Sequence, residues 1–166
     1  AAWEAHKSAT MPRFYWDWTI ALEYQRKGEN PYTPPVSLYF GLHRSLQLMF
    51  EEGLQNIFQR HIQVGEFTRR GMERLNLEMF AKPGWASSVV TAVRVPDGVD
   101  GKQIVRIMED KHGVVLAGGQ EHLAGKIFRV GHMGWVHQAD IEECLAALRQ
   151  TLQELGHKLP AEAVTG

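Results

Sequence analysis

The spacing of apolar side chains changes along the chain and predicts helices and strands in turn. Residues 37–52 and 54–75 carry apolar side chains at helical spacing, with Gly53 between them, and residues 18–27 predict a shorter helix that a proline-rich loop follows. Residues 88–96 and 126–131 are rich in β-branched and alternating apolar residues and predict strands. A last apolar stripe predicts a helix that Gly156 ends; it consists of Ile141, Cys144, Leu145, Leu148, Leu152 and Leu155.

The order of these elements indicates the fold class. Asp100 is placed to cap a helix that reaches Lys111, and residues 112–119 predict a turn, a short strand and a glycine-rich bend. Helices, strand, helix, two strands and a final helix predict an α+β fold, in which helices pack on a small mixed or antiparallel sheet. Cys144 lies on the apolar stripe of the last helix, which favours a buried thiol over a nucleophile.

Composition narrows the classes of function. The 166 residues are 44% hydrophobic and 22% charged, which is typical of a globular protein. The 18 basic and 19 acidic residues are scattered, so no basic patch indicates nucleic-acid binding. No run approaches the roughly 18 apolar residues that a membrane helix needs, and we expect a cytoplasmic protein. The single cysteine excludes an internal disulfide and a thiolate metal cluster within the chain.

Sequence motifs for common catalytic sites are missing. The eight histidines form no H-x-x-x-H or H-E-x-x-H pair, and G-x-S-x-G, P-loop and G-x-G-x-x-G motifs are absent. We therefore predict no metal site, although His122, His132 and His137 leave open a cluster formed in space. The adjacent glutamates of the helices are typical of solvated faces.

Arg129 is the candidate binding residue. It stands between Phe128 and Val130 in "GKIFRVGHMG", so it faces the side of the strand opposite to theirs. One interpretation is a surface arginine on an edge strand. The other is recognition of a small anion, because a guanidinium is the usual partner of a carboxylate and nearby glycines would leave room for one; these are Gly118, Gly119, Gly131 and Gly134.

Several sequence motifs, in the same order along the chain as in a known family, support the interpretation of Arg129 as an anion-binding residue. "YTPPVSLYFGL", "EEGLQNIFQRH", "VTAVRVPDGVDG", "VLAGGQEHLAGKIFRVGHMG" and "LRQTLQELGH" resemble the C-terminal part of class V pyridoxal-phosphate aminotransferases. The resemblance is strongest to the alanine–glyoxylate and serine–pyruvate group, and it covers residues 3–157. Some cyanobacterial relatives are named soluble hydrogenase 42-kDa subunit, but a single cysteine does not suit a nickel-iron site.

The resemblance implies roles for individual residues. It implies that Arg129 binds the α-carboxylate of small amino-acid and 2-oxo-acid substrates. It also implies that Thr33, with Tyr32 beside it, contacts the cofactor phosphate of the other subunit in a homodimer. Many relatives have a phosphate-binding tyrosine where this chain has Asn30. Whether Tyr32 takes over that role is left open.

The resemblance also implies that the Schiff-base lysine and the acidic partner of the cofactor lie upstream of these residues. None of the seven lysines stands in the expected context, so no catalytic residue is predicted here, and the residues alone are expected to be inactive and without bound cofactor. We accordingly predict that residues 1–35 are a connecting helix and interface loop, residues 36–157 the small domain and residues 158–166 a tail.

Two alternatives remain. One is an interaction module without catalysis, in which an aromatic cluster at residues 14–18 and the first long helix, residues 37–52, mediate dimerisation. The other is a relative of the class V lyase and desulfurase branch. Desulfurases need a mobile reactive cysteine, and Cys144 on a buried helical stripe is poorly placed for that role.

Overall fold

The computed structural model describes residues 1–160 and consists of two compact units, the first formed by residues 1–51 and the second beginning at Glu52. Each unit is described by itself. Most of the predicted tail, residues 161–166, lies outside the described residues. The predicted division at residues 35 and 157 stays a prediction.

The first unit contains α1 (Ala2–Ser8), α2 (Trp18–Lys27) and nearly all of α3 (Val36–Glu52). Asp17 explains where α2 begins, because its carboxylate accepts hydrogen bonds from the backbone N–H groups of Thr19 (2.8 Å) and Ile20 (3.4 Å). Gly28 ends α2 at φ +74°, a left-handed conformation that glycine adopts readily. None of the three helices contains a buried residue.

Aromatic side chains make the main contacts of the first unit. The His6 ring stacks on Trp18, and Trp3 meets both rings edge-on. Tyr15 stacks on Tyr32 with ring centroids 4.5 Å apart. The aromatic cluster at residues 14–18 nevertheless remains largely exposed, so it forms no local core.

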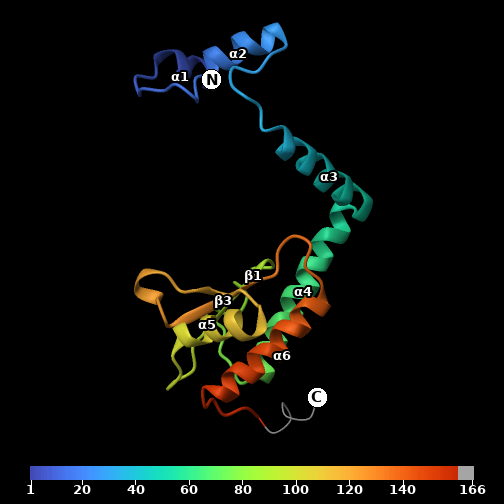
Figure 1. The fold of residues 1–166 in the computed structure, drawn as a ribbon, viewed down its shortest axis with the longest axis vertical. Coiled ribbons are helices and arrows are strands. Elements are labelled where there is room, and N and C mark those ends of the chain that lie inside the picture. The colour runs from blue at the N-terminus through green and yellow to red at the C-terminus, as the bar shows by residue number, and fades with distance from the viewer. Residues whose placement is uncertain (161–166) are drawn as a thin grey trace. The chain divides into compact units, whose positions relative to one another are not determined.

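The second unit confirms the predicted α+β class (Figure 1). Its helices are α4 (Leu54–Arg74), α5 (Gly101–His112), the short 3-10 helix η1 (Glu121–Leu123) and α6 (Gln138–Glu154). Its strands are β1 (Val90–Arg94), β2 (Ala117–Gly118) and β3 (Ile127–Gly131). The strands form one antiparallel sheet in the order β1-β3-β2. The predicted cap of α5 is also confirmed, because the Asp100 carboxylate accepts a hydrogen bond from the Lys102 N–H.

Strand β3 is the central strand of this sheet. Ala92 of β1 pairs with Arg129 from one side, and Ala117 of β2 pairs with it from the other. The interpretation of Arg129 as a residue of an edge strand is therefore wrong. The sequence predicted a short strand within residues 112–119, where β2 lies, but it did not show that this strand pairs with β3, because pairing is a tertiary contact.

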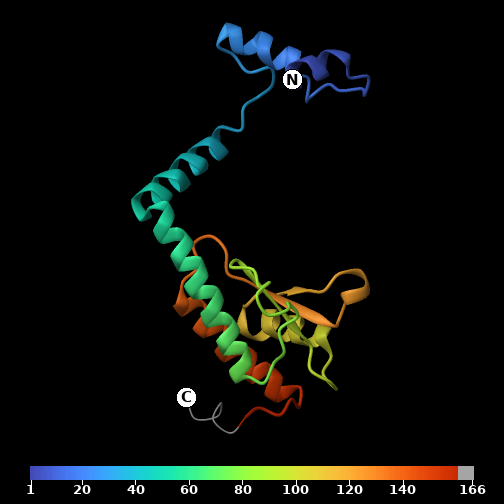
Figure 2. The same cartoon turned by 180° about the vertical axis from the view of Figure 1, so that it is seen from behind.

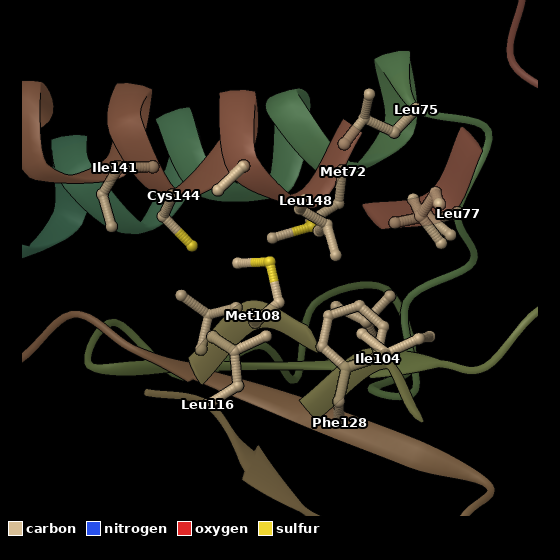
Figure 3. Packing of buried hydrophobic residues seen from close by; sticks show 14 of the residues in the cluster. Met72, Leu75, Leu77, Ile104, Met108, Leu116, Phe128, Ile141, Cys144 and Leu148 are labelled. Carbon is tan, nitrogen blue, oxygen red and sulfur yellow. The ribbon is translucent and has the colours of Figure 1, made fainter. Parts of the chain in front are cut away.

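The hydrophobic core lies between one face of the sheet and the helices. Figure 3 shows Ile141, Cys144 and Leu148 directed from α6 toward Phe128 and Leu116. Met108 of α5 fills the space between these layers and is fully buried. The predicted apolar stripe of α6 is confirmed, since its members are buried or partly buried.

The apolar face predicted for α4 is buried only in its C-terminal half. Met72 and Leu75 belong to the core, whereas Leu54 is 61% exposed and Phe58 is 49% exposed. α4 and α6 lie side by side along the buried half, as Figures 1 and 2 both show. The apolar face predicted for α4 is thus longer than the hydrophobic core of this unit, and its N-terminal half stays exposed.

No helix among residues 1–160 is both long enough and apolar enough to cross a membrane.

Candidate functional site

The candidate site is built around Arg129 on the central strand. Phe128 is fully buried and Val130 is 3% exposed, so both belong to the core face of the sheet. Arg129 lies on the opposite face and is partly buried, as the alternation of side chains along a strand requires. The predicted orientation of all three side chains is confirmed.

Gly118 fixes the orientation of the guanidinium. Its carbonyl oxygen accepts hydrogen bonds from Nε (3.2 Å) and Nη2 (2.9 Å) of Arg129. This occupies the Nε–Nη2 edge of the guanidinium fork and leaves the edge formed by Nη1 and the second N–H of Nη2. Within residues 1–160, Arg129 forms no ion pair with a carboxylate. The arrangement therefore presents a partly buried positive charge with two parallel donors.

The glycines near Arg129 have separate roles. Gly118 supplies the carbonyl that orients the guanidinium, and this contact was missed because sequence reasoning treated the glycines only as open space. Gly119 lies tightly against Leu123, since a Cβ atom there would be 2.0 Å from the Leu123 carbonyl oxygen. Gly134 does not approach the guanidinium through any hydrogen bond; its backbone is bound instead by Arg60 and His61 of α4.

His132 closes the sheet three residues after Arg129. Its side chain is 1% exposed, and its Nε2 atom lies 2.9 Å from Oγ1 of Thr91 on β1. Its backbone N–H donates to the Val89 carbonyl at 2.9 Å. Burial holds the pKa of His132 below its ordinary value, because the protonated ring would lose its hydration. His132 thus joins the end of β3 to β1 as a buried residue whose neutral form is favoured.

The predicted phosphate contacts lie in the first unit. Thr33 is exposed, between Tyr32 and the two prolines Pro34 and Pro35. The Tyr32 hydroxyl donates to the Phe14 carbonyl at 3.0 Å, and its ring is stacked on Tyr15. The backbone on both sides of Thr33 is therefore restrained, while the residue itself stays exposed.

Other candidate chemistry finds no support in the described part of the chain. Among residues 1–160 no group of three or more histidine, cysteine, aspartate or glutamate side chains is arranged to hold a metal ion. The Cys144 thiol is buried, and burial raises its pKa to about 11. It therefore stays protonated at neutral pH, which disfavours the desulfurase alternative.

Proteins of known function resemble this chain in sequence and in fold. No family model matches the chain. The chain is 45% identical over 95% of its length to the soluble hydrogenase 42 kDa subunit of Anabaena cylindrica and 39% identical over 94% to the serine–glyoxylate aminotransferase of Arabidopsis thaliana. The solved structure of an alanine–glyoxylate aminotransferase from Nostoc sp. superimposes with a TM-score of 0.83, at 31% identity over 91% of the chain.

The chain corresponds to the C-terminal part of class V aminotransferases. It spans about 40% of these proteins, namely 41% of the Anabaena protein, 39% of the Arabidopsis enzyme and 41% of the Nostoc structure. The α+β architecture is that of the same part of class V aminotransferases. The remaining part of these relatives has no counterpart among the 166 residues.

Proposed function

We propose that this chain is the C-terminal domain of a pyridoxal-phosphate-dependent aminotransferase, which transfers an amino group from alanine or serine to glyoxylate or pyruvate. The names of the relatives support this choice of substrates, since one is a serine–glyoxylate and another an alanine–glyoxylate aminotransferase. The reaction proposed is a two-step exchange in which donor and acceptor use the same site in turn.

Arg129 carries the proposal. Every proposed donor and acceptor has a carboxylate next to the reacting carbon, and Arg129 offers two parallel N–H donors to such a group. Gly118 holds the neighbouring edge of the guanidinium, so the arginine is oriented before a substrate arrives. Fixing the carboxylate in this way fixes the rotation of the substrate about the bond to its reacting carbon.

Thr33 is the residue of this chain that fits the cofactor phosphate. The residue is exposed, and the neighbouring prolines and the Tyr32 stack restrain its backbone. When bound, pyridoxal phosphate supplies the carbonyl that accepts the amino group and the ring that stabilises negative charge on the reacting carbon. We place no catalytic lysine within these residues.

Tyr32 is a weaker candidate for the phosphate than Thr33. Its hydroxyl already donates to the Phe14 carbonyl, and its ring is held on Tyr15. Asn30 is exposed at the position where many relatives are expected to have tyrosine. We therefore propose that Tyr32 supports the loop that carries Thr33 and that the phosphate has one hydroxyl ligand fewer here than in those relatives.

The test is transamination by the full-length protein that contains this chain, with alanine or serine as donor and glyoxylate or pyruvate as acceptor. Truncating a desolvated partner of a charged group costs about 2–5 kcal/mol, so Arg129→Ala is expected to lower kcat/KM by roughly 30- to 5,000-fold. Arg129→Lys keeps the charge but loses the fork and should recover only part of the activity.

Arg94→Ala is the matched control, because Arg94 lies on the adjacent strand and its side chain makes exposed contacts away from Arg129, an ion pair with Glu78 and a contact with the Phe80 ring. It should retain nearly full activity. An Arg129→Ala enzyme with unchanged kinetics would show that the carboxylate binds elsewhere.

The same structure also supports a role in subunit contact. Many large apolar side chains of α3 are exposed, including Leu38 at 69%, Phe40 at 72% and Phe50 at 81%. Exposed apolar area of this kind is typical of association surfaces. We propose that the enzyme is a homodimer. A chain that forms a stable dimer without cofactor, while the full-length protein shows no transamination, would instead favour the interaction module.

A further inference from the structure

We infer that Arg60 and His61 are positioning residues, which clamp the loop of residues 132–137 and thereby hold the end of β3 in the place that lets Arg129 bind a carboxylate. This inference rests on the proposed function, since it concerns the same site. It adds two residues that do not touch the substrate.

Arg60 makes the first half of the clamp. Its Nη1 atom donates to the carbonyl oxygens of Gly134 (2.7 Å) and Val136 (3.0 Å), two carbonyls of the loop. Its other edge is paired with both carboxylate oxygens of Glu52, at 2.6 Å from Nε and 2.9 Å from Nη2. This pairing raises the pKa of Arg60 and lowers that of Glu52. Glu52 thus orients Arg60 in the way that Gly118 orients Arg129.

His61 makes the second half of the clamp and contacts the same loop residue, Gly134. The Gly134 N–H donates to Nε2 of His61 at 3.1 Å, so Nε2 must be unprotonated. The other ring nitrogen, Nδ1, is then the protonated one and donates to the Ile57 carbonyl at 2.7 Å. The carbonyl of Gly134 is bound to Arg60 and its N–H to His61, while its φ of +77° is one that glycine adopts readily.

The clamp connects to Arg129 through a short and well-restrained segment. His132 holds the start of the loop, because it bonds to Val89 and Thr91 of β1. His137 closes the loop by donating its N–H to Asp140 at the beginning of α6. Between these points, Arg60 and His61 of α4 bind the loop backbone by hydrogen bonds, so these two residues tie the loop to α4.

A purely structural role explains these contacts less well. Arg60 and Glu52 are polar and lie outside the hydrophobic core cluster of this unit. Replacing Arg60 removes no core side chain, but it leaves the Glu52 carboxylate, whose side chain is 19% exposed, without its partner, and it removes the contact with the Trp135 ring. The replacement also releases the carbonyls of Gly134 and Val136, five and seven residues after Arg129, so the positioning role is read from the Arg129 signal and not from stability.

The first test uses nitrogen-15 NMR of the full-length protein that contains this chain and needs no substrate. Arg60→Gln and His61→Phe should speed amide exchange at Gly134 by at least about tenfold, and they should shift the Nε–Hε signal of Arg129. His61→Gln returns a neutral acceptor and should rescue part of the protection. The control is Arg70→Gln, because Arg70 lies on the same helix and forms only an exposed ion pair with Glu66.

The second test uses the full-length enzyme. Arg60→Gln, or Arg60→Lys if the former does not fold, should raise KM for both substrates by about tenfold, with a smaller change in kcat, because the carboxylate site is loosened. A faster exchange at Gly134 with no shift of the Arg129 signal and no change in KM would overturn the inference.

The two proposals fail in different ways. If Arg129→Ala leaves KM unchanged, the carboxylate site itself is wrong and the clamp has no substrate to serve. If Arg129→Ala raises KM while the Arg60 and His61 variants behave like Arg70→Gln, only the positioning role is refuted.

Discussion

Replacement of Gly119 by alanine tests how the turn after β2 supports Arg129. A Cβ atom at this position would lie 2.0 Å from the backbone carbonyl oxygen of Leu123 and 2.9 Å from Ile127 Cγ1. Ordinary contact begins near 3.4 Å, so the two backbone segments would have to separate by about 1.4 Å. Backbone cannot yield as a flexible side chain does, and the strain falls on the turn as a whole.

The magnitude follows from the bonds within this turn. Overpacking costs about 1–3 kcal/mol, and a weakened backbone hydrogen bond costs about 1 kcal/mol more. The bonds at risk are Gly119 N–H to Ile127 (3.0 Å) and Lys126 N–H to Leu123 (3.0 Å). We therefore expect Gly119→Ala to lower the free energy of unfolding by roughly 2–4 kcal/mol, a large part of the total of a typical domain.

Gly118→Ala is a control one residue away. A Cβ atom there meets nothing within 4 Å, so its free energy of unfolding should stay within about 0.5 kcal/mol of the parent chain. The measurement is urea unfolding followed by circular dichroism, with the Arg129 Nε–Hε signal recorded in parallel. Equal stability of the two variants would refute the argument from close packing, and an unmoved Arg129 signal in Gly119→Ala would refute its link to the guanidinium.

Two further predictions concern the ionisable groups of the core. Burial lowers the pKa of His132 from its ordinary 6.5, so the unfolded chain binds the extra proton more readily, and the stability that His132 contributes is full above pH 6.5 and declines as the pH falls below it. Urea unfolding at pH 8 and pH 5.5 should therefore show a smaller decline in stability for His132→Asn than for the parent chain. An equal decline would contradict the assignment. The Cys144 thiol, with a pKa raised to about 11, should react with Ellman's reagent at pH 8 only as fast as the chain unfolds; rapid reaction in native buffer would show that the thiol is accessible.

The sequence predicted the long elements well because their signals are local. The stripe of α6 and the cap of α5 at Asp100 need only neighbouring residues to be recognised. The central position of β3 was not predictable in this way, since it depends on pairing with β2, a strand of two residues whose partners are ten and twelve positions away.

The candidate site was likewise predictable only in part. Alternation along β3 indicated that Arg129 faces away from Phe128, and this orientation is observed. Its orienting partner is a backbone carbonyl, however, and every residue has one, so no residue type marks Gly118 for that role. Arg60 and His61 were also missed, because more than 70 positions separate them from the loop they contact.

The position of β3 has a consequence for synthesis on the ribosome. β1 and β2 both precede β3 in the chain, and neither pairs with the other, so the sheet stays incomplete until residue 131 has emerged. At roughly 5–20 residues per second, β1 waits a few seconds for its partner. Arg129 arrives on the strand that closes the sheet. A nascent chain that stops short of β3 would therefore lack the binding arginine and the sheet centre together, so an incomplete product would have no half-assembled site with which to capture metabolites.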